Sequence, residues 1–152
     1  MQHKKENHYQ HLAVMAVLSF VAMYILMYAM VNAFGDVYNN VNQVYMAGLM
    51  AAPMIVIELI VMRAMYHNAK LNRMIMVASV ALGALLFAFI QQQAAVSDVQ
   101  FIRSMIPHHS AAILMCREAA IQDQEIRSLC GAITSSQQQE IDQMNAILRR
   151  LQ

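Results

Sequence analysis

The sequence predicts an all-α protein in which three membrane-spanning helices precede an exterior helical hairpin. Two observations lead to this fold class. Hydrophobic residues make up 59% of the 152 residues and charged residues only 12%, which is about half the charged share of a soluble domain. The apolar residues also gather in three long runs, whereas the last third of the chain shows the periodicity of amphipathic helices.

The three runs have lengths suited to a lipid bilayer, whose hydrocarbon layer takes about 20 apolar residues. The first expected span covers residues 12–34 and contains no Lys, Arg, Asp or Glu. The second covers residues 45–65, interrupted only by Glu58 and one arginine, and the third covers residues 74–90. We therefore expect residues 1–92 to form a domain embedded in the lipid bilayer.

The positive charges near these runs predict how the chain is oriented. Lys4 and Lys5 precede the first span and Lys70 lies between the second and third, whereas residues 35–44 carry no Lys or Arg. The positive-inside rule therefore places the N-terminus in the cytoplasm. Three crossings then leave residues 93–152 outside, which is the periplasm if the membrane is the inner membrane of a Gram-negative bacterium.

The exterior residues 93–152 are expected to form a domain of two helices joined by a short turn. Ser97, followed three residues later by a glutamine, is a capping-box signature for the first helix, over residues 98–120. A turn at residues 121–123 precedes a second helix at about residues 124–151. The apolar stripe expected on the first helix consists of Phe101, Met105, Ala112, Met115 and Ala119.

One broad face of the first hairpin helix carries sulfur and imidazole side chains. At 100° per residue, Met105, His108, His109, Met115 and Cys116 share this face. Thioether, thiolate and imidazole ligands select soft ions such as copper(I), whereas magnesium and calcium need oxygen ligands. The pattern indicates a copper(I) site, although methionines at helical spacing also serve as core filler, and that alternative stays open.

Antiparallel packing of the two helices would add residues of the second helix to this face. The histidine pair is then expected opposite Gln137 and Gln138, and Met105 opposite Ile141 and Met144, which makes Met144 an auxiliary metal ligand beside Cys116. Gln137 and Glu140 are candidates to hold an imidazole N–H of a metal-bound histidine. Cys116 comes opposite Cys130, which permits a disulfide, while Cys116 as a metal thiolate is the equal alternative.

At these residues the sequence resembles the bacterial family catalogued as domain of unknown function 305, in its three-span membrane-anchored type. The resemblance rests on an M-I-P-H-H run followed by A-x-x-M, and then by Q-x-x-E-I-x-x-M on the next helix, over roughly the last 55 residues. The matching residues are Asp98, Phe101, Met105, Ile106, Pro107, His108, His109, Ala112, Met115, Gln137, Glu140, Ile141 and Met144.

The resemblance implies a ferritin-like helical fold, a periplasmic location, and copper binding through Met and His with a role in copper tolerance. Longer family members build a four-helix unit, whereas this chain supplies one hairpin and one histidine pair. A homodimer or higher homo-oligomer would complete such a bundle. A periplasmic copper-handling protein is a further expected partner.

Other classes of function are less well supported by the sequence. A net charge of +1 provides no basic surface for nucleic acid, and no catalytic signature such as H-E-x-x-H or a phosphate-binding loop is present, so we expect no enzyme. A structural or assembly module whose hairpin docks a partner is the main alternative. A metal transport component is another, because Glu58 and most of the 15 methionines lie in the expected spans and intramembrane carboxylates often mark functional sites.

Overall fold

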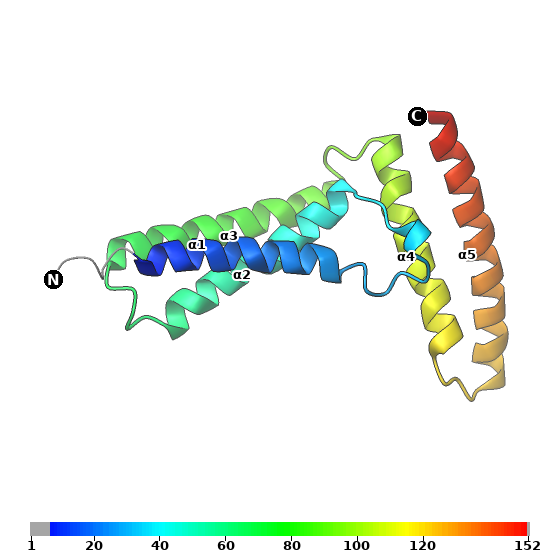
Figure 1. Ribbon diagram of the computed structural model, residues 1–152, viewed down its shortest axis with the longest axis horizontal. Coiled ribbons are helices and arrows are strands. Elements are labelled where there is room, and N and C mark those ends of the chain that lie inside the picture. The colour runs from blue at the N-terminus through cyan, green and yellow to red at the C-terminus, as the bar shows by residue number, and fades with distance from the viewer. Residues whose placement is uncertain (1–6, 152) are drawn as a thin grey trace. The chain divides into compact units, whose positions relative to one another are not determined.

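The computed structural model describes residues 7–151, which form helices and connecting segments and contain no strand. The helices are α1 (Asn7–Leu26), α2 (Val41–Val61), α3 (Ala69–Gln92), α4 (Asp98–Glu118) and α5 (Gln124–Leu151), with a short 3-10 helix, η1 (Phe34–Asp36), between the first two (Figure 1). The predicted all-α class is therefore confirmed. Lys4 and Lys5, on which the expected orientation partly depends, lie outside the described residues.

Three helices are long and apolar enough to cross a membrane, as predicted. These segments are His8–Leu26, Val41–Val61 and Ala69–Gln92. The chain divides into two compact units, of which the first contains the described part of Met1–Leu26 together with Asn42–Ala94. The second contains Met27–Val41 together with the described part of Ala95–Gln152.

The first unit packs its helices through small residues and a cluster at one end. Ala47, Ala51 and Ala52 of α2 are buried. A side chain at Gly48 would come within 2.7 Å of the end of the Leu86 side chain on α3, so the absence of a side chain lets the helices approach closely. At one end, three buried residues form a cluster with partly buried neighbours from all three helices: Leu12, Leu59 and Tyr66.

The expected boundaries of the first two spans were wrong. The first was expected to reach residue 34, but α1 ends at Leu26 because the chain then turns away to join the second unit. Met27 and Met30 therefore lie beyond the helix. The second span was expected at residues 45–65, but α2 ends at Val61, and the chain turns so that Tyr66 packs in the cluster with Leu12 and Leu59.

The second unit consists of the antiparallel helices α4 and α5 together with residues 27–41, which we call the connecting segment. Ser97 caps α4, as predicted, with its side chain accepting from the Gln100 amide. Asp123 accepts hydrogen bonds from the amides of Glu125 and Ile126 at 2.9 and 3.0 Å, which satisfies free N–H groups at the start of α5. The sequence analysis had placed the connecting segment in the membrane domain, whereas it belongs to the second unit and contacts α4 and α5.

Candidate functional site

The buried face of α4 differs from the apolar stripe expected from the sequence. Phe101 and Met115 were expected to point inward, but they are 52% and 51% exposed, and Ala119 is exposed as well. The buried positions are shifted around the helix by about 100°, the angle of one residue. They are Ile102, Ile106, Pro107, His109, Ser110 and Ile113.

The shift arises because α4 has two packing partners rather than one. On one side, Ile102, Ile106 and Ile113 form a core with Ile141 and Leu148 of α5. On the other side, the connecting segment packs against α4 and forms hydrogen bonds with it. The helical periodicity of α4 alone contains no signal for a partner that comes from before the second span.

The principal contact of the connecting segment is with Ser110, whose side chain is fully buried. The Ser110 hydroxyl donates to Asp36 Oδ2 at 2.6 Å and accepts from the Asn32 amide at 3.0 Å. Asn32 Oδ1 also accepts a hydrogen bond from Arg117. The Ser110 hydroxyl therefore both donates and accepts a hydrogen bond, as a buried polar group requires. The sequence analysis missed both Asp36 and Ser110.

A second contact compensates for the proline inside α4. Pro107 has no amide hydrogen, so the carbonyl of Arg103 loses its helical hydrogen bond. The buried side chain of Asn40 fills this position, because its Nδ2 donates to the Arg103 carbonyl at 3.4 Å and to the Tyr38 carbonyl at 3.0 Å. The carbonyl that the proline frees is thus bound by the connecting segment.

His109 lies in the interface between α4 and α5 and has a partner at each ring nitrogen. Its Nδ1 is 3.0 Å from the Met105 carbonyl one turn earlier on the same helix. Its Nε2 is 2.7 Å from Glu140 Oε2 on α5. Both partners carry hydrogen-bond acceptors, and which ring nitrogen donates depends on the tautomer of the imidazole. Glu140 itself remains 52% exposed, which leaves it free to move.

The register of the hairpin differs slightly from the expected one. The histidine pair was expected opposite Gln137 and Gln138, but His109 meets Glu140 instead. The stagger is close to one helical turn. Gln137 is partly buried and Gln138 is exposed, with Gln138 donating to Asp142 on its own helix. The same register places Met105 and Met144 at one level, a turn away from the His109–Glu140 pair.

The remaining predicted ligands occupy different positions. His108 is exposed, and its ring centroid lies 6.2 Å from that of His109 in an edge-on orientation. Met105 is partly buried, and Met144 packs against the isoleucine core. Met115 is exposed and lies two helical turns beyond His108, roughly 10 Å along the axis. The structure therefore keeps the rings of His108 and His109 side by side on α4, whereas Met144 packs against the core and Met115 lies further along α4.

Cys116 and Cys130 are joined by a disulfide, with Cα atoms 5.2 Å apart. Of the two alternatives that the sequence left open, the structure contains the disulfide. A sulfur in this bond is not a thiolate, so Cys116 is not a metal ligand while the bond is closed. Within residues 7–151, no three His, Cys, Asp or Glu side chains gather closely enough to hold an ion.

Glu58 lies in the last turn of α2 rather than near the middle of a span. Its Oε1 accepts a hydrogen bond of 3.2 Å from the Tyr66 hydroxyl, just beyond the helix. Asn72 joins Tyr66 to Tyr9, because it donates to the Tyr66 carbonyl and accepts from the Tyr9 hydroxyl. Glu58 thus belongs to a polar network that connects α1, α2 and α3 at one end of the first unit.

These features define a class of protein: an all-α chain with three helices apolar enough for a membrane and a disulfide-linked helical hairpin. The family model for the domain of unknown function DUF305 matches residues 50–148, from within α2 to near the end of α5, and the chain belongs to this family. The match therefore extends well beyond the hairpin.

A relative is found in a giant virus. The chain is 37% identical over 144 residues to the uncharacterized protein L153 of Acanthamoeba polyphaga mimivirus. The alignment covers 91% of this chain and 93% of that protein, so the likeness includes the apolar helices as well as the hairpin. No solved structure matches the chain.

Proposed function

We propose that the protein is a membrane-anchored copper(I)-binding protein that serves copper homeostasis or tolerance. The observation that carries this proposal is the geometry of His109. The Met105 carbonyl holds Nδ1, so the ring presents Nε2 as the metal-binding nitrogen, the arrangement that is usual when the other nitrogen donates to a backbone carbonyl. In the metal-free protein, Glu140 occupies the position that the ion would take.

The neighbouring side chains supply the soft ligands that copper(I) prefers. His108 and His109 add two imidazoles that are neighbours on α4, with ring centroids 6.2 Å apart. Met105 and Met144 lie one turn away at matching levels of α4 and α5. We therefore assign these four residues to one site, without Met115 or the disulfide-bonded Cys116.

Glu140 has a different role in this proposal from the one expected from the sequence. The sequence suggested that it holds a metal-bound imidazole, whereas here it competes with the ion for Nε2. Metal binding at Nε2 would require Glu140, which is 52% exposed, to give up its contact with this nitrogen. Gln137, one turn earlier on α5, stays a candidate to hold the bound imidazole.

The proposed location is the inner membrane of a bacterium, with the N-terminus in the cytoplasm and the hairpin in the periplasm. The contacts of the connecting segment support this topology. Residues 27–41 follow α1 and residues 95–151 follow α3, and both belong to one compact unit. If α1, α2 and α3 each cross the membrane once, these two segments lie on the same side of it. Lys70 and Arg73, which follow α2 and begin α3, then lie on the opposite side.

A second copy of the chain would complete a ferritin-like four-helix bundle from two hairpins. The exposed position of His108 supports this part of the proposal, because an isologous interface would bring two such imidazoles together. We expect the protein to be a homodimer or a higher homo-oligomer in mild detergent. A monomeric mass with a folded hairpin would contradict this assembly. A periplasmic copper-handling protein is the expected recipient of the ion.

The alternative is a structural or assembly module in which His109 serves only the hairpin. One observation favours it: both nitrogens of His109 already have partners, as a core histidine requires. Under this alternative, the metal-free protein is fully stable and copper(I) does not raise its melting temperature. The transport alternative is less well supported, because Glu58 lies at a helix end and binds Tyr66.

The test is an anaerobic copper(I) titration of the full-length protein in mild detergent, against a competing chelator. Replacing His108 and His109 with Ala is expected to weaken binding by roughly 100-fold or more, since two ligands are lost. His67→Ala is the matched control, because His67 is an exposed histidine on the α2–α3 connection and its loss leaves the affinity unchanged. Equal affinity for the double variant and the control would refute the site.

Glu140→Ala separates the two roles of the carboxylate. If Glu140 competes with the ion, its removal tightens copper(I) binding by roughly tenfold, because a charge-assisted hydrogen bond no longer has to be broken. If it holds a bound imidazole instead, the same variant binds more weakly. A weaker affinity would therefore overturn the proposed displacement while leaving the ligand assignment intact.

A further inference from the structure

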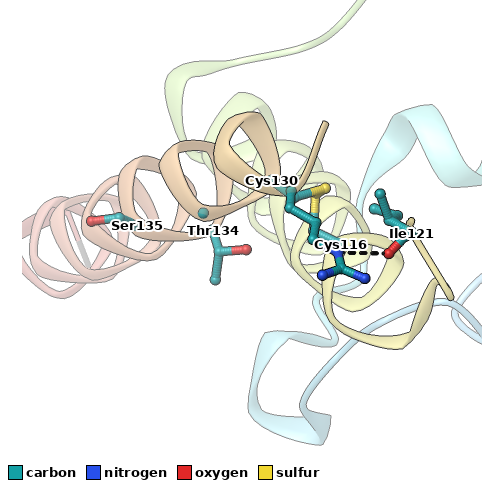
Figure 2. A pocket seen from close by; sticks show the side chains of 7 residues that line it. Cys116, Ile121, Cys130, Thr134 and Ser135 are labelled. Atoms are coloured by element: carbon teal, nitrogen blue, oxygen red, sulfur yellow. Dashed lines mark hydrogen bonds between the residues drawn. A yellow bond between two sulfur atoms is a disulfide. The ribbon is translucent and has the colours of Figure 1, made fainter. Parts of the chain in front are cut away.

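A cavity of about 400 Å³ lies beside the disulfide at the turn end of the hairpin. Figure 2 shows the bond between Cys116 and Cys130, with Thr134 and Ser135 further along α5 and Ile121 beside it in the turn. Both cysteines are partly exposed. The cavity is lined by Cys116, Ile121, Arg127, Cys130, Gly131, Thr134 and Ser135.

Gly131 keeps this cavity open directly after Cys130. A Cβ placed at Gly131 would meet no atom within 4 Å, and its φ angle is not positive. Neither close packing nor backbone conformation therefore requires glycine at this position, although glycine inside a helix is destabilising relative to alanine. Gly131 lines the cavity next to Cys130 and adds no side chain to it.

The surrounding part of the hairpin is tied together by the disulfide rather than by a core. Between Ile113 on α4 and Ile141 on α5, no described residue is buried. The core of the second unit reaches to Ile113, one helical turn before Cys116, and contains neither cysteine. Opening the bond therefore requires no disruption of the core, in contrast to a disulfide enclosed in a packed interior.

Arg127 provides a fixed positive charge in the wall of the cavity. Its Nε donates to the Ile121 carbonyl at 2.8 Å and its Nη2 to Gln122 Oε1 at 3.5 Å. The guanidinium is thus held at the turn beside the cysteines. A positive charge near a cysteine stabilises the thiolate form, which is the leaving group when a disulfide is opened.

We propose that the cavity is a thiol–disulfide exchange site, at which a protein dithiol reduces the Cys116–Cys130 bond. A thiolate of the donor attacks Cys130 Sγ, the Sγ–Sγ bond breaks, and its electron pair leaves on Cys116 Sγ as a thiolate facing Arg127. The second donor thiol then attacks the mixed disulfide and releases the Cys130 thiolate. The donor loses two electrons and becomes a disulfide, and its two protons end on Cys116 and Cys130.

The exchange site goes beyond the copper(I) proposal and does not depend on it, because it uses none of the four proposed ligands. Its test uses the full-length protein in mild detergent without metal. The probe is a four-residue peptide with a cysteine at each end, supplied in the dithiol form. The rate of disulfide opening is measured by trapping free thiols with an alkylating reagent and determining the mass of the product by mass spectrometry.

The native bond is expected to open under conditions in which the hairpin stays helical by circular dichroism. Gly131→Leu fills the cavity and slows opening by roughly tenfold, since access to Cys130 is lost. Ala132→Leu is the matched control, because Ala132 is exposed on the same helix but does not line the cavity, and it opens at the native rate. Leucine favours helix over glycine, so folding is not at risk.

Two results would overturn the exchange site. One is a native bond that opens only after a denaturant has unfolded the hairpin. The other is an equal rate of opening for Gly131→Leu, Ala132→Leu and the native protein. Arg127→Gln provides a second measurement. This variant is expected to slow opening by the peptide, because the guanidinium no longer stabilises the leaving thiolate. An unchanged rate would contradict the role of Arg127 in the exchange site.

Discussion

The contact between Asp36 and Ser110 is expected to be worth about 1.5–3 kcal/mol to the second unit. The value follows from a short hydrogen bond, 2.6 Å, between a carboxylate and a hydroxyl that is fully buried, because hydrogen bonds to charged groups contribute in this range. Asp36→Ala leaves the buried hydroxyl without its acceptor. Ser110→Ala removes the donor and also the acceptor of the Asn32 amide.

A double-mutant cycle measures this contact directly. The free energy of local opening of α4 is obtained from native-state hydrogen exchange of the full-length protein in detergent. The double variant is expected to lose little more stability than Ser110→Ala alone, so the coupling energy equals the contact energy. Asp142→Ala is the control, since this exposed residue only accepts from Gln138 within α5 and costs under about 0.5 kcal/mol. A coupling energy below about 0.5 kcal/mol would refute the attachment of the connecting segment to α4.

Three further predictions concern the core, the proline and the polar network of the first unit. Ile106→Ala is expected to cost about 2–5 kcal/mol in the unfolding free energy of the second unit, because the side chain is fully buried in the isoleucine core; a cost under about 1 kcal/mol in chemical denaturation would contradict this core. Asn40→Ala is expected to lower the free energy of local opening of α4 by about 1 kcal/mol when Pro107 is present. In a Pro107→Ala background the loss is expected to be smaller, because the Arg103 carbonyl regains its helical partner. Equal losses in the two backgrounds, measured by hydrogen exchange, would disprove the compensation. Burial, and then the Glu58 carboxylate, raise the pKa of Tyr66 above its usual value of 10.0, so the folded protein holds this proton more tightly than the unfolded chain. The stabilisation from this proton is therefore complete below about pH 10 and is lost as the pH rises further. In thermal melts, Tyr66→Phe should lack this alkaline decline in melting temperature. An identical decline in the variant and the native protein would count against the network.

The sequence predicts those parts of the fold whose signals are local. The apolar runs identify three helices long enough for a membrane. The serine before residue 98 marks the start of α4, and the turn at residues 121–123 precedes an α5 whose bounds match the expected ones. Helix caps and hydrophobic periodicity depend on residues within a few positions of each other, so a single sequence contains them.

The parts that depend on distant contacts were not predictable in this way. The connecting segment contacts α4 from more than 60 residues away, for example Asn40 with the Arg103 carbonyl. This second partner shifts the buried face of α4, so Phe101 and Met115 are exposed where the periodicity placed them inside. The sequence named Glu140 as a candidate partner of an imidazole, and the structure places it at His109 Nε2, but the register that selects this pair is one that spacing leaves open by one turn.

The composition of the second unit also imposes an order on biosynthesis. Tyr38 donates to Asn145 across 107 residues of sequence, and at about 5–20 residues per second the ribosome needs roughly 5–20 seconds to make that stretch. The connecting segment is synthesised before α2 and α3, so its partners on α4 and α5 become available only after both helices have been made. On the proposed topology, a chain in which either α2 or α3 failed to insert would have the connecting segment and the hairpin on opposite sides of the membrane, so only correctly inserted chains would complete the unit that contains His109.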